Sequence, residues 1–222
     1  MTRIKICGLR CEQDISFVNE ARPDYAGFIV NFPRSRRNLS PERFRGLTAG
    51  SGGAAGLDPG IARVAVVVDQ PVSFAAELLA GGAADIIQLH GHEDERYIGQ
   101  LRELLDKDRD IRGSERIWKA FRIRGRDDLE KVFSSSADRV ILDNGWGTGE
   151  VFDWSLLEKR RAGKNDGEFI LAGGLDPGNL AEAIKTMTPW GVDISSGVET
   201  ENAKDRDKIL AAVEICRRDS VG

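Results

Sequence analysis

Two residues with acid–base side chains each close a short apolar run and stand directly before a turn-forming segment. Cys7 ends the run RIKIC and is followed by Gly8, and Asp143 ends RVILD and is followed by NGWGTG. A thiolate can take up a proton and a carboxylic acid can donate one, which together meet the needs of general acid–base catalysis. Position alone is more typical of an inert core thiol and of a turn-forming aspartate, so the pair gains meaning only from the residues around it.

Two further apolar runs end in small residues that favour an anion site. Gly173 and Gly174 follow ILA, and Ser195, Ser196 and Gly197 follow VDI. Glycines let backbone N–H groups approach a phosphate, and the N-terminus of a short helix adds a favourable dipole. Taken singly, the glycine pair is typical of a tight turn and the Ser-Ser-Gly run of a helix cap. Because the two motifs follow consecutive apolar runs, we predict that they bind one phosphate group together.

The elements that must position these residues repeat along the whole chain. Short runs rich in Val and Ile, typical of parallel strands buried on both faces, predict strands at residues 4–7, 25–30, 62–68, 85–89, 117–121, 139–142, 168–172 and 192–194. Apolar residues at helical spacing predict helices at residues 12–21, 41–47, 72–80, 95–105, 126–133, 154–161, 177–187 and 206–217. Ser40-Pro41 and Asp176-Pro177 are typical of an N-cap followed by a first-turn proline.

Repeated strand–helix units predict an α/β fold with a parallel sheet. Eight such units favour closure into a single (β/α)8 barrel, with residues 1–222 as one domain, and an open doubly wound sheet is the alternative. Active sites of such barrels lie at the C-terminal ends of the strands, where the candidate residues would meet. The glycine-rich residues 49–60 are expected to form a loop on the opposite face, and the charged residues 107–115 a solvated loop.

Composition excludes several classes of protein. The 222 residues carry a formal net charge of -4, and their basic side chains are scattered among acidic ones, which argues against a nucleic-acid partner. No apolar run approaches the ~18 residues of a membrane-spanning helix, so we expect no membrane association. The three cysteines lack metal-ligand spacing. We therefore expect a cytoplasmic protein with free thiols and no secretory signal.

Seven segments in order resemble one enzyme family. They are KICGL, GFIVNFPRSRRNLS, VAVVVDQP, IIQLHG, ILDNGWGTGEVFDW, ILAGGLDPGN and VDISSGVE, spread between residues 4 and 208. This pattern resembles phosphoribosylanthranilate isomerase of tryptophan biosynthesis. The resemblance implies a (β/α)8 barrel of the ribulose-phosphate-binding type that uses no metal and no organic cofactor. It also implies an aldose–ketose isomerase, which converts N-(5'-phosphoribosyl)anthranilate to 1-(2-carboxyphenylamino)-1-deoxyribulose 5-phosphate by an Amadori rearrangement.

The resemblance also implies roles for individual residues. It makes Cys7 the general base and Asp143 the general acid, and the PRSRR run places Arg37 where the family binds the anthranilate carboxylate. A guanidinium fork suits a planar carboxylate. Arg36 matches no family position to which we assign a role, and we expect Arg34 and Arg36 to be solvated loop charges.

Three polar side chains are candidates for supporting roles. Lys5 lies two residues before Cys7 and should share its face of the strand, where it either assists the thiolate or fills the barrel interior. Gln88 and His90 alternate in the same way. His90 either contacts the substrate or orients a neighbouring group.

Three alternatives remain to be weighed. The related sugar isomerase of histidine biosynthesis resembles a barrel with aspartate at the end of its first strand, where this chain has Cys7. The pair His90-x-His92 suggests a metal-dependent hydrolase, but the chain has only two histidines, fewer than such sites need alongside their carboxylates. A non-catalytic phosphate binder would need neither the acid nor the base.

Some features stay open at this point. Arg10 stands where the family usually has threonine, Cys11 follows it, and Trp146 occupies a glycine-rich loop. The expected partner is a small phosphorylated sugar–anthranilate substrate. The sequence does not distinguish a monomer from a homodimer, and it does not show what lowers the pKa of Cys7.

Overall fold

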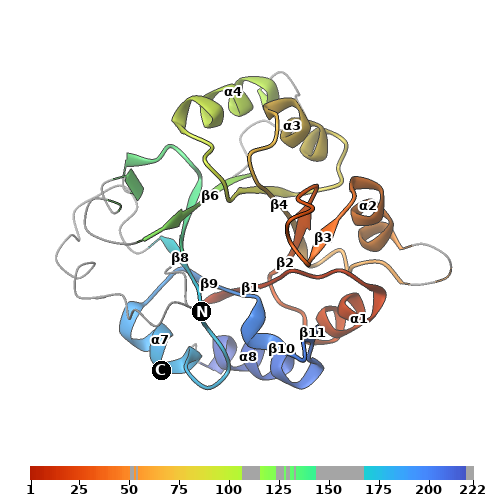
Figure 1. Ribbon diagram of the computed structural model, residues 1–222. Coiled ribbons are helices and arrows are strands. Elements are labelled where there is room, and N and C mark those ends of the chain that lie inside the picture. The colour runs from red at the N-terminus through yellow and green to blue at the C-terminus, as the bar shows by residue number, and fades with distance from the viewer. Residues whose placement is uncertain are drawn as a thin grey trace.

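Eight parallel strands close into a ring, and helices surround it on the outside (Figure 1). The computed structural model describes residues 1–50, 53, 55–106, 116–123, 128, 131–132, 134–143 and 168–218. In ring order, the strands are β1 (Arg3–Cys7), β2 (Tyr25–Val30), β4 (Ala62–Val67), β5 (Ile86–Leu89), β6 (Ile117–Arg122), β7 (Arg139–Asp143), β8 (Phe169–Ala172) and β9 (Gly191–Ile194). Strand β1 pairs with both β2 and β9, which closes the barrel. The predicted barrel is therefore confirmed and the open sheet is wrong.

The described helices lie between consecutive strands. They are α1 (Glu12–Ala21), α2 (Pro41–Ala49), α3 (Val72–Ala80), α4 (Glu95–Leu105), α7 (Leu180–Met187) and α8 (Arg206–Arg218). Helix α2 begins as predicted, because the Ser40 side chain accepts a hydrogen bond from the backbone N–H of Arg43 and proline occupies the first turn. No helix among the residues given above is long and apolar enough to cross a bilayer.

The predicted start of the helix at residue 177 is wrong. Helix α7 begins at Leu180, with Asn179 as its N-cap. The Asp176 carboxylate does accept hydrogen bonds from the backbone N–H groups of Gly178 and Asn179, but it closes a tight turn before the helix. The predicted helices at 126–133 and 154–161, the loop at 107–115 and Trp146 lie wholly or partly outside the described residues.

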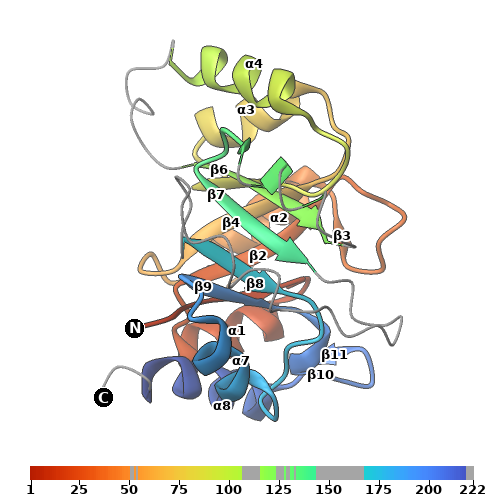
Figure 2. The ribbon, with the colours of Figure 1, turned by 90° about the vertical axis from the view of Figure 1, so that its left-hand side faces the viewer.

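Four short elements extend the C-terminal ends of the strands. Strand β3 (Asn38–Leu39) pairs with β2 outside the ring. After β9, the chain forms a 3-10 turn, η1 (Ser196–Val198), and then an antiparallel hairpin of β10 (Glu199–Thr200) and β11 (Ala203–Lys204). In the side view of Figure 2, the β7 arrow points toward the side on which this hairpin lies.

Aromatic side chains fill the barrel at its N-terminal end. Tyr25 and Trp118 meet edge to face with ring centroids 4.9 Å apart, and Trp190 packs 6.1 Å from each. Arg139 lies over the Trp190 ring at 4.7 Å. Tyr25 begins β2, Trp118 lies near the start of β6 and Trp190 precedes β9. The cluster therefore closes the barrel at the N-terminal ends of its strands. The opposite end is left for the site.

Candidate active site

A pocket of about 400 Å³ lies at the C-terminal ends of the strands. Its walls include apolar side chains from several strands, such as Ile29, Val66 and Val68. Most of the residues predicted from the sequence also line it: Cys7, Arg37, Gln88, His90, Asp143, Gly173, Gly174, Ser195 and Ser196. Residues from seven separate segments of the chain therefore converge on one cavity.

The Cys7 thiol lies against a buried ion pair. Lys5 donates a hydrogen bond from Nζ to Asp193 Oδ2 at 2.8 Å, with both side chains almost inaccessible to solvent. The same ammonium hydrogen-bonds the Cys7 thiol. Gly27 makes room for both groups, because a Cβ there would lie 2.9 Å from the sulfur and 2.8 Å from Lys5 Cε. Lys5 thus lies beside the thiol and fills the barrel interior.

Opposing effects act on the pKa of Cys7. Burial raises it, the positive charge of Lys5 lowers it, and the negative charge of Asp193 raises it again, with a net upward shift. Burial also acts to lower the pKa of Lys5, but Asp193 and Cys7 outweigh it, so the ammonium keeps its proton. The thiolate therefore depends on a cation that is itself partly neutralised by a carboxylate.

A second cluster joins the predicted acid to two side chains of β5 and its C-terminal end. His90 Nε2 lies 3.6 Å from Asp143 Oδ2, and Gln88 Nε2 lies 3.1 Å from His90 Nδ1. Because an amide nitrogen only donates, His90 Nδ1 accepts here, and the proton of a neutral imidazole lies on Nε2, facing Asp143. Burial lowers the pKa of His90 although Asp143 acts to raise it, which keeps the ring neutral. His90 thus lies between Asp143 and Gln88 and contacts both side chains.

The predicted phosphate site is a set of tight turns after β8 and β9. Gly173 and Gly174 have φ angles of 92° and 60°, which side chains other than glycine rarely adopt. Gly197 does not line the pocket. A Cβ at this position would lie 1.9 Å from the Leu175 carbonyl oxygen, so glycine lets the η1 turn pack against the loop after β8. Gly173, Gly174, Ser195 and Ser196 all line the pocket between these loops. Ser195 also donates to the Cys7 carbonyl at 3.1 Å.

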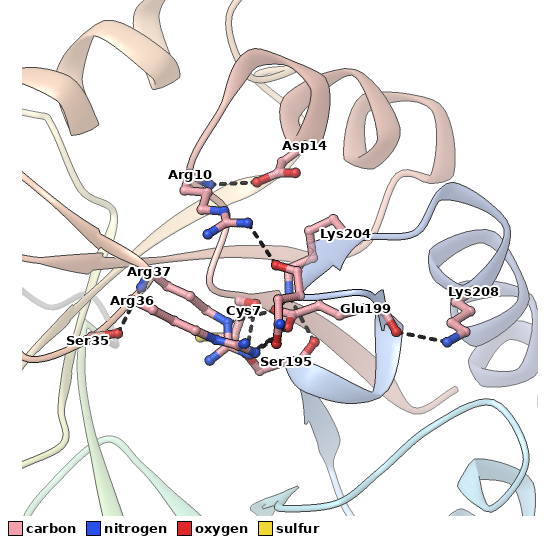
Figure 3. Close-up of polar contacts among 11 residues, drawn as sticks. Cys7, Arg10, Asp14, Ser35, Arg36, Arg37, Ser195, Glu199, Lys204 and Lys208 are labelled. Carbon is pink, nitrogen blue, oxygen red and sulfur yellow. Dashed lines mark hydrogen bonds and ion pairs between the residues drawn. The ribbon is translucent and has the colours of Figure 1, made fainter.

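Arg37 reaches the pocket but is held from behind by a carboxylate (Figure 3). Its Nε and Nη2 donate to Glu199 Oε1 and Oε2, both at 2.7 Å. The Arg37 side chain crosses Gly8, where a Cβ would lie 2.4 Å from Arg37 Cδ. Arg36, expected to be a solvated loop charge, is half exposed and also bonds Glu199, at 2.7 Å. Arg36 is therefore an exposed loop charge as predicted, and the structure adds its contact with Glu199.

Three charged residues of the site were not predicted from the sequence. Asp193 had a signal, since it is an acid within a buried apolar strand. Glu199 and Lys204 had no such signal in the sequence, because their contacts with Arg37 and Ser195 exist only in the folded protein. Lys204 Nζ bonds Ser195 O at 2.8 Å and Glu199 Oε1 at 3.0 Å.

The described residues contain no cluster of three His, Cys, Asp or Glu side chains that could hold a metal ion. His92 is 96% exposed and its Nδ1 lies 3.0 Å from Asp69 Oδ2, away from the pocket lining. The two histidines of the predicted pair thus serve different neighbours. Chemistry in this cavity is available from a thiol, a carboxyl–imidazole pair and a guanidinium group.

Comparisons with known proteins identify one family of relatives. Residues 4–215 match the family model described as N-(5'phosphoribosyl)anthranilate (PRA) isomerase. The chain is 40% identical over 225 residues to N-(5'-phosphoribosyl)anthranilate isomerase of Endomicrobium trichonymphae, covering 98% of this chain and 99% of the relative. It is also 40% identical over 214 residues to the enzyme of the same name from Acetivibrio thermocellus, covering 94% of this chain and 93% of the relative.

Solved structures show the same likeness. The phosphoribosyl anthranilate isomerase of Thermotoga maritima superposes with a TM-score of 0.80 at 30% identity, covering 98% of this chain and all of that one. A phosphoribosyl anthranilate isomerase in complex with reduced 1-(o-carboxyphenylamino)-1-deoxyribulose 5-phosphate superposes with a TM-score of 0.79, also at 30% identity and with the same coverage.

Proposed function

The chain belongs to the N-(5'-phosphoribosyl)anthranilate isomerase family, and from this premise we propose that its pocket isomerises N-(5'-phosphoribosyl)anthranilate in tryptophan biosynthesis. The observation that carries the proposal is the convergence of four groups on one cavity of about 400 Å³. A thiol, a carboxyl, a guanidinium and a glycine–serine cradle are what a substrate with a phosphate at one end and a benzoate at the other requires.

The reaction transfers protons and needs no external oxidant or reductant. Asp143 donates a proton to the ring oxygen of the ribose, and the bond between that oxygen and C1 breaks as the nitrogen lone pair forms a C=N bond. Cys7, as thiolate, then removes the proton from C2, and the electrons of that C–H bond form an enolamine. Uptake of a proton at C1 and loss of the enol proton yield the ketose, 1-(2-carboxyphenylamino)-1-deoxyribulose 5-phosphate. Each acid–base contribution is worth ~10²–10⁴ in rate.

The neighbours of each group support its assigned role. Lys5 is the cation with the largest effect on the Cys7 pKa, which it lowers through its charge and a hydrogen bond. Asp143 must carry a proton to act as acid. Its Oδ2 lies 3.6 Å from His90 Nε2, and both side chains line the pocket.

The two ends of the pocket account for the two ends of the substrate. The turns at Gly173, Gly174, Ser195 and Ser196, backed by Gly197, suit the phosphate, because backbone N–H groups and hydroxyls donate to its oxygens. Arg37 suits the carboxylate of the aromatic ring, since a guanidinium edge matches a carboxylate in two hydrogen bonds.

The cellular setting follows from the same residues. The three cysteines are free, which fits a reducing cytoplasmic compartment. One relative from Thermotoga maritima is described as dimeric in the name of its structure. For this chain, both the monomer and the homodimer stay predictions.

The direct test is turnover of phosphoribosylanthranilate, followed by the loss of its anthranilate-type fluorescence. We expect the wild-type protein to be active, and Cys7→Ala and Asp143→Asn to lose ~10²–10⁴ in kcat while still binding a product analogue. An assay with the aminoaldose of histidine biosynthesis separates this function from that of the related sugar isomerase. Equal activity of Cys7→Ser and the wild type would exclude Cys7 as the base.

A further inference from the structure

One carboxylate behind the pocket binds three basic side chains at once. Glu199 accepts hydrogen bonds from Arg37 Nε and Nη2 at 2.7 Å each, from Arg36 Nη2 at 2.7 Å and from Lys204 Nζ at 3.0 Å. Figure 3 shows these side chains converging beside Cys7. The three cations come from two separate segments, the loop after β2 and the β10–β11 hairpin.

This carboxylate lies deeper than the guanidinium that it binds. The Glu199 side chain is 6% exposed and that of Lys204 is 2% exposed, whereas Arg37 is 16% exposed and lines the pocket. Glu199 is not among the residues that line this cavity. Of the side chains that it bonds, Arg37 is the one that lines the cavity.

The hairpin holds Glu199 in place. Glu199 of β10 stands opposite Lys204 of β11 in the antiparallel register, and its backbone carbonyl accepts a hydrogen bond from Lys208 Nζ at 2.8 Å. Arg10 Nη2 donates to the Asn202 carbonyl at 2.7 Å, which ties the hairpin turn to the loop after β1. The carboxylate thus sits on a braced element and not on a free loop.

The contact geometry divides the Arg37 guanidinium into two sides. Glu199 takes the side formed by Nε and Nη2 in a fork-like pair. The edge formed by the two terminal nitrogens is the other one on which a carboxylate can bind with two parallel hydrogen bonds. An arginine held on one side presents the second edge without having to lose side-chain freedom when a ligand arrives.

We propose that Glu199 is a positioning residue that selects carboxylated substrates. It fixes Arg37 so that the edge formed by its two terminal nitrogens faces the end of the pocket where the substrate's anthranilate ring would lie. This inference rests on the proposed function, in which Arg37 binds the anthranilate carboxylate. Arg36 and Lys204 complete the arrangement, because their charges balance that of Glu199. Without them, the Glu199 carboxylate would repel the carboxylate of the substrate.

The charge of Glu199 is essential to this role. Burial acts to raise its pKa, but hydrogen bonds from Arg37 and the charge of Lys204 bring it to about 2, so the group is ionised at neutral pH. A neutral amide in its place would leave three cations around one uncharged group. Their mutual repulsion, and an amide N–H₂ aimed at donors, would move Arg37 off its present line.

The test compares two ligands in a binding experiment that needs no turnover. One probe is reduced 1-(o-carboxyphenylamino)-1-deoxyribulose 5-phosphate, and the other is the same compound with hydrogen in place of the carboxylate. Calorimetry gives Kd for each with the wild type and with Glu199→Gln. We expect Glu199→Gln to weaken the carboxylated probe about tenfold and to leave the other within about twofold.

Two further variants guard the interpretation. Glu12→Gln is the matched control, because Glu12 forms a comparable two-bond pair with Arg43, at 2.7 and 2.8 Å, and neither residue lines the pocket. It should change neither Kd. If Glu199→Gln fails to fold, Glu199→Gln/Lys204→Met removes one charge of each sign and should show the same selective loss.

Each outcome decides the matter. A selective loss for the carboxylated probe supports the positioning role. Equal losses for both probes would mean that Glu199 is merely structural, and tighter binding of the carboxylated probe would mean that it only competes for Arg37; either result overturns the inference. Wild-type protein that binds the carboxylated probe but does not turn over phosphoribosylanthranilate would refute the proposed function alone.

Discussion

Removal of the Lys5 charge should raise the pKa of the Cys7 thiol. Lys5 is the cation that hydrogen-bonds this thiol, in a site where burial already disfavours the thiolate. A hydrogen bond to a charged group is worth ~1.5–3 kcal/mol. Since one pKa unit corresponds to about 1.36 kcal/mol, Lys5→Met should raise the Cys7 pKa by about 1–2 units.

The opposite change should have the opposite sign. Asp193 also acts on Cys7, and its negative charge raises the thiol pKa. Asp193→Asn removes that charge and leaves the Lys5 ammonium with Cys7 as its nearest partner, so the Cys7 pKa should fall. Lys5→Met leaves a buried carboxylate unpaired, which can cost ~3–5 kcal/mol of stability. The double variant Lys5→Met/Asp193→Asn avoids that cost and should show a smaller rise than Lys5→Met alone.

The pKa is read from the rate of alkylation by iodoacetamide across pH, with peptide mass spectrometry to identify the site. Arg10 separates Cys7 from Cys11 after tryptic cleavage, and Cys216 of α8 falls on a third peptide, between Lys208 and Arg217. In the kinetic assay, a higher Cys7 pKa moves the rise of kcat/KM to higher pH. Lys5→Met should therefore lose about 10–100-fold in activity at neutral pH, which is the thiolate fraction that a shift of about 1–2 units removes, and recover in alkaline buffer. An unchanged Cys7 pKa in Lys5→Met, or shifts of the same sign in the two single variants, would refute this account.

Two further predictions concern stability. Gly197→Ala places a Cβ 1.9 Å from the Leu175 carbonyl oxygen, so we expect a loss of ~3 kcal/mol in the free energy of unfolding and a higher KM. Gly99→Ala is its control in thermal unfolding, because nothing lies within 4 Å of that site in α4; an equal fall in Tm for both would contradict the steric reason. Trp118→Ala removes the centre of the aromatic cluster and should lower the free energy of unfolding by ~3–5 kcal/mol. At temperatures below its Tm, the variant should keep the kcat of the wild type. A lower kcat with unchanged stability by calorimetry would instead show that the aromatic cluster acts on the chemistry.

Local patterns were sufficient to predict the barrel. The helices 12–21, 72–80 and 95–105 and the strand 25–30 match the structure at both ends, because apolar periodicity is a property of the residues themselves. The start of α7 was wrong since an Asp-Pro pair suits a turn as well as a helix cap. The alternatives for Lys5 and His90 needed coordinates, because sequence spacing gives a direction and not a partner.

The charges around Arg37 could not be predicted for a different reason. Arg37 and Glu199 are separated by 162 residues, and their contact exists only after the ring closes. Arg10, an unusual residue on the sequence evidence, proved to bond the hairpin turn at Asn202, from 192 residues away. Pairs at such separation leave no periodic signature in a single chain.

The pairing of β1 with β9 makes the surroundings of the Cys7 thiol depend on the closed barrel. The bonds that set the thiol's surroundings, Lys5 to Asp193 and Ser195 to Cys7, each join residues 188 positions apart. Such contacts form late, since closing a long loop costs entropy that only the finished structure repays. A chain that lacks β9 would contain Cys7 and Asp143 but neither of these two bonds beside the thiol. We therefore expect no activity from a barrel in which β1 and β9 have not yet paired.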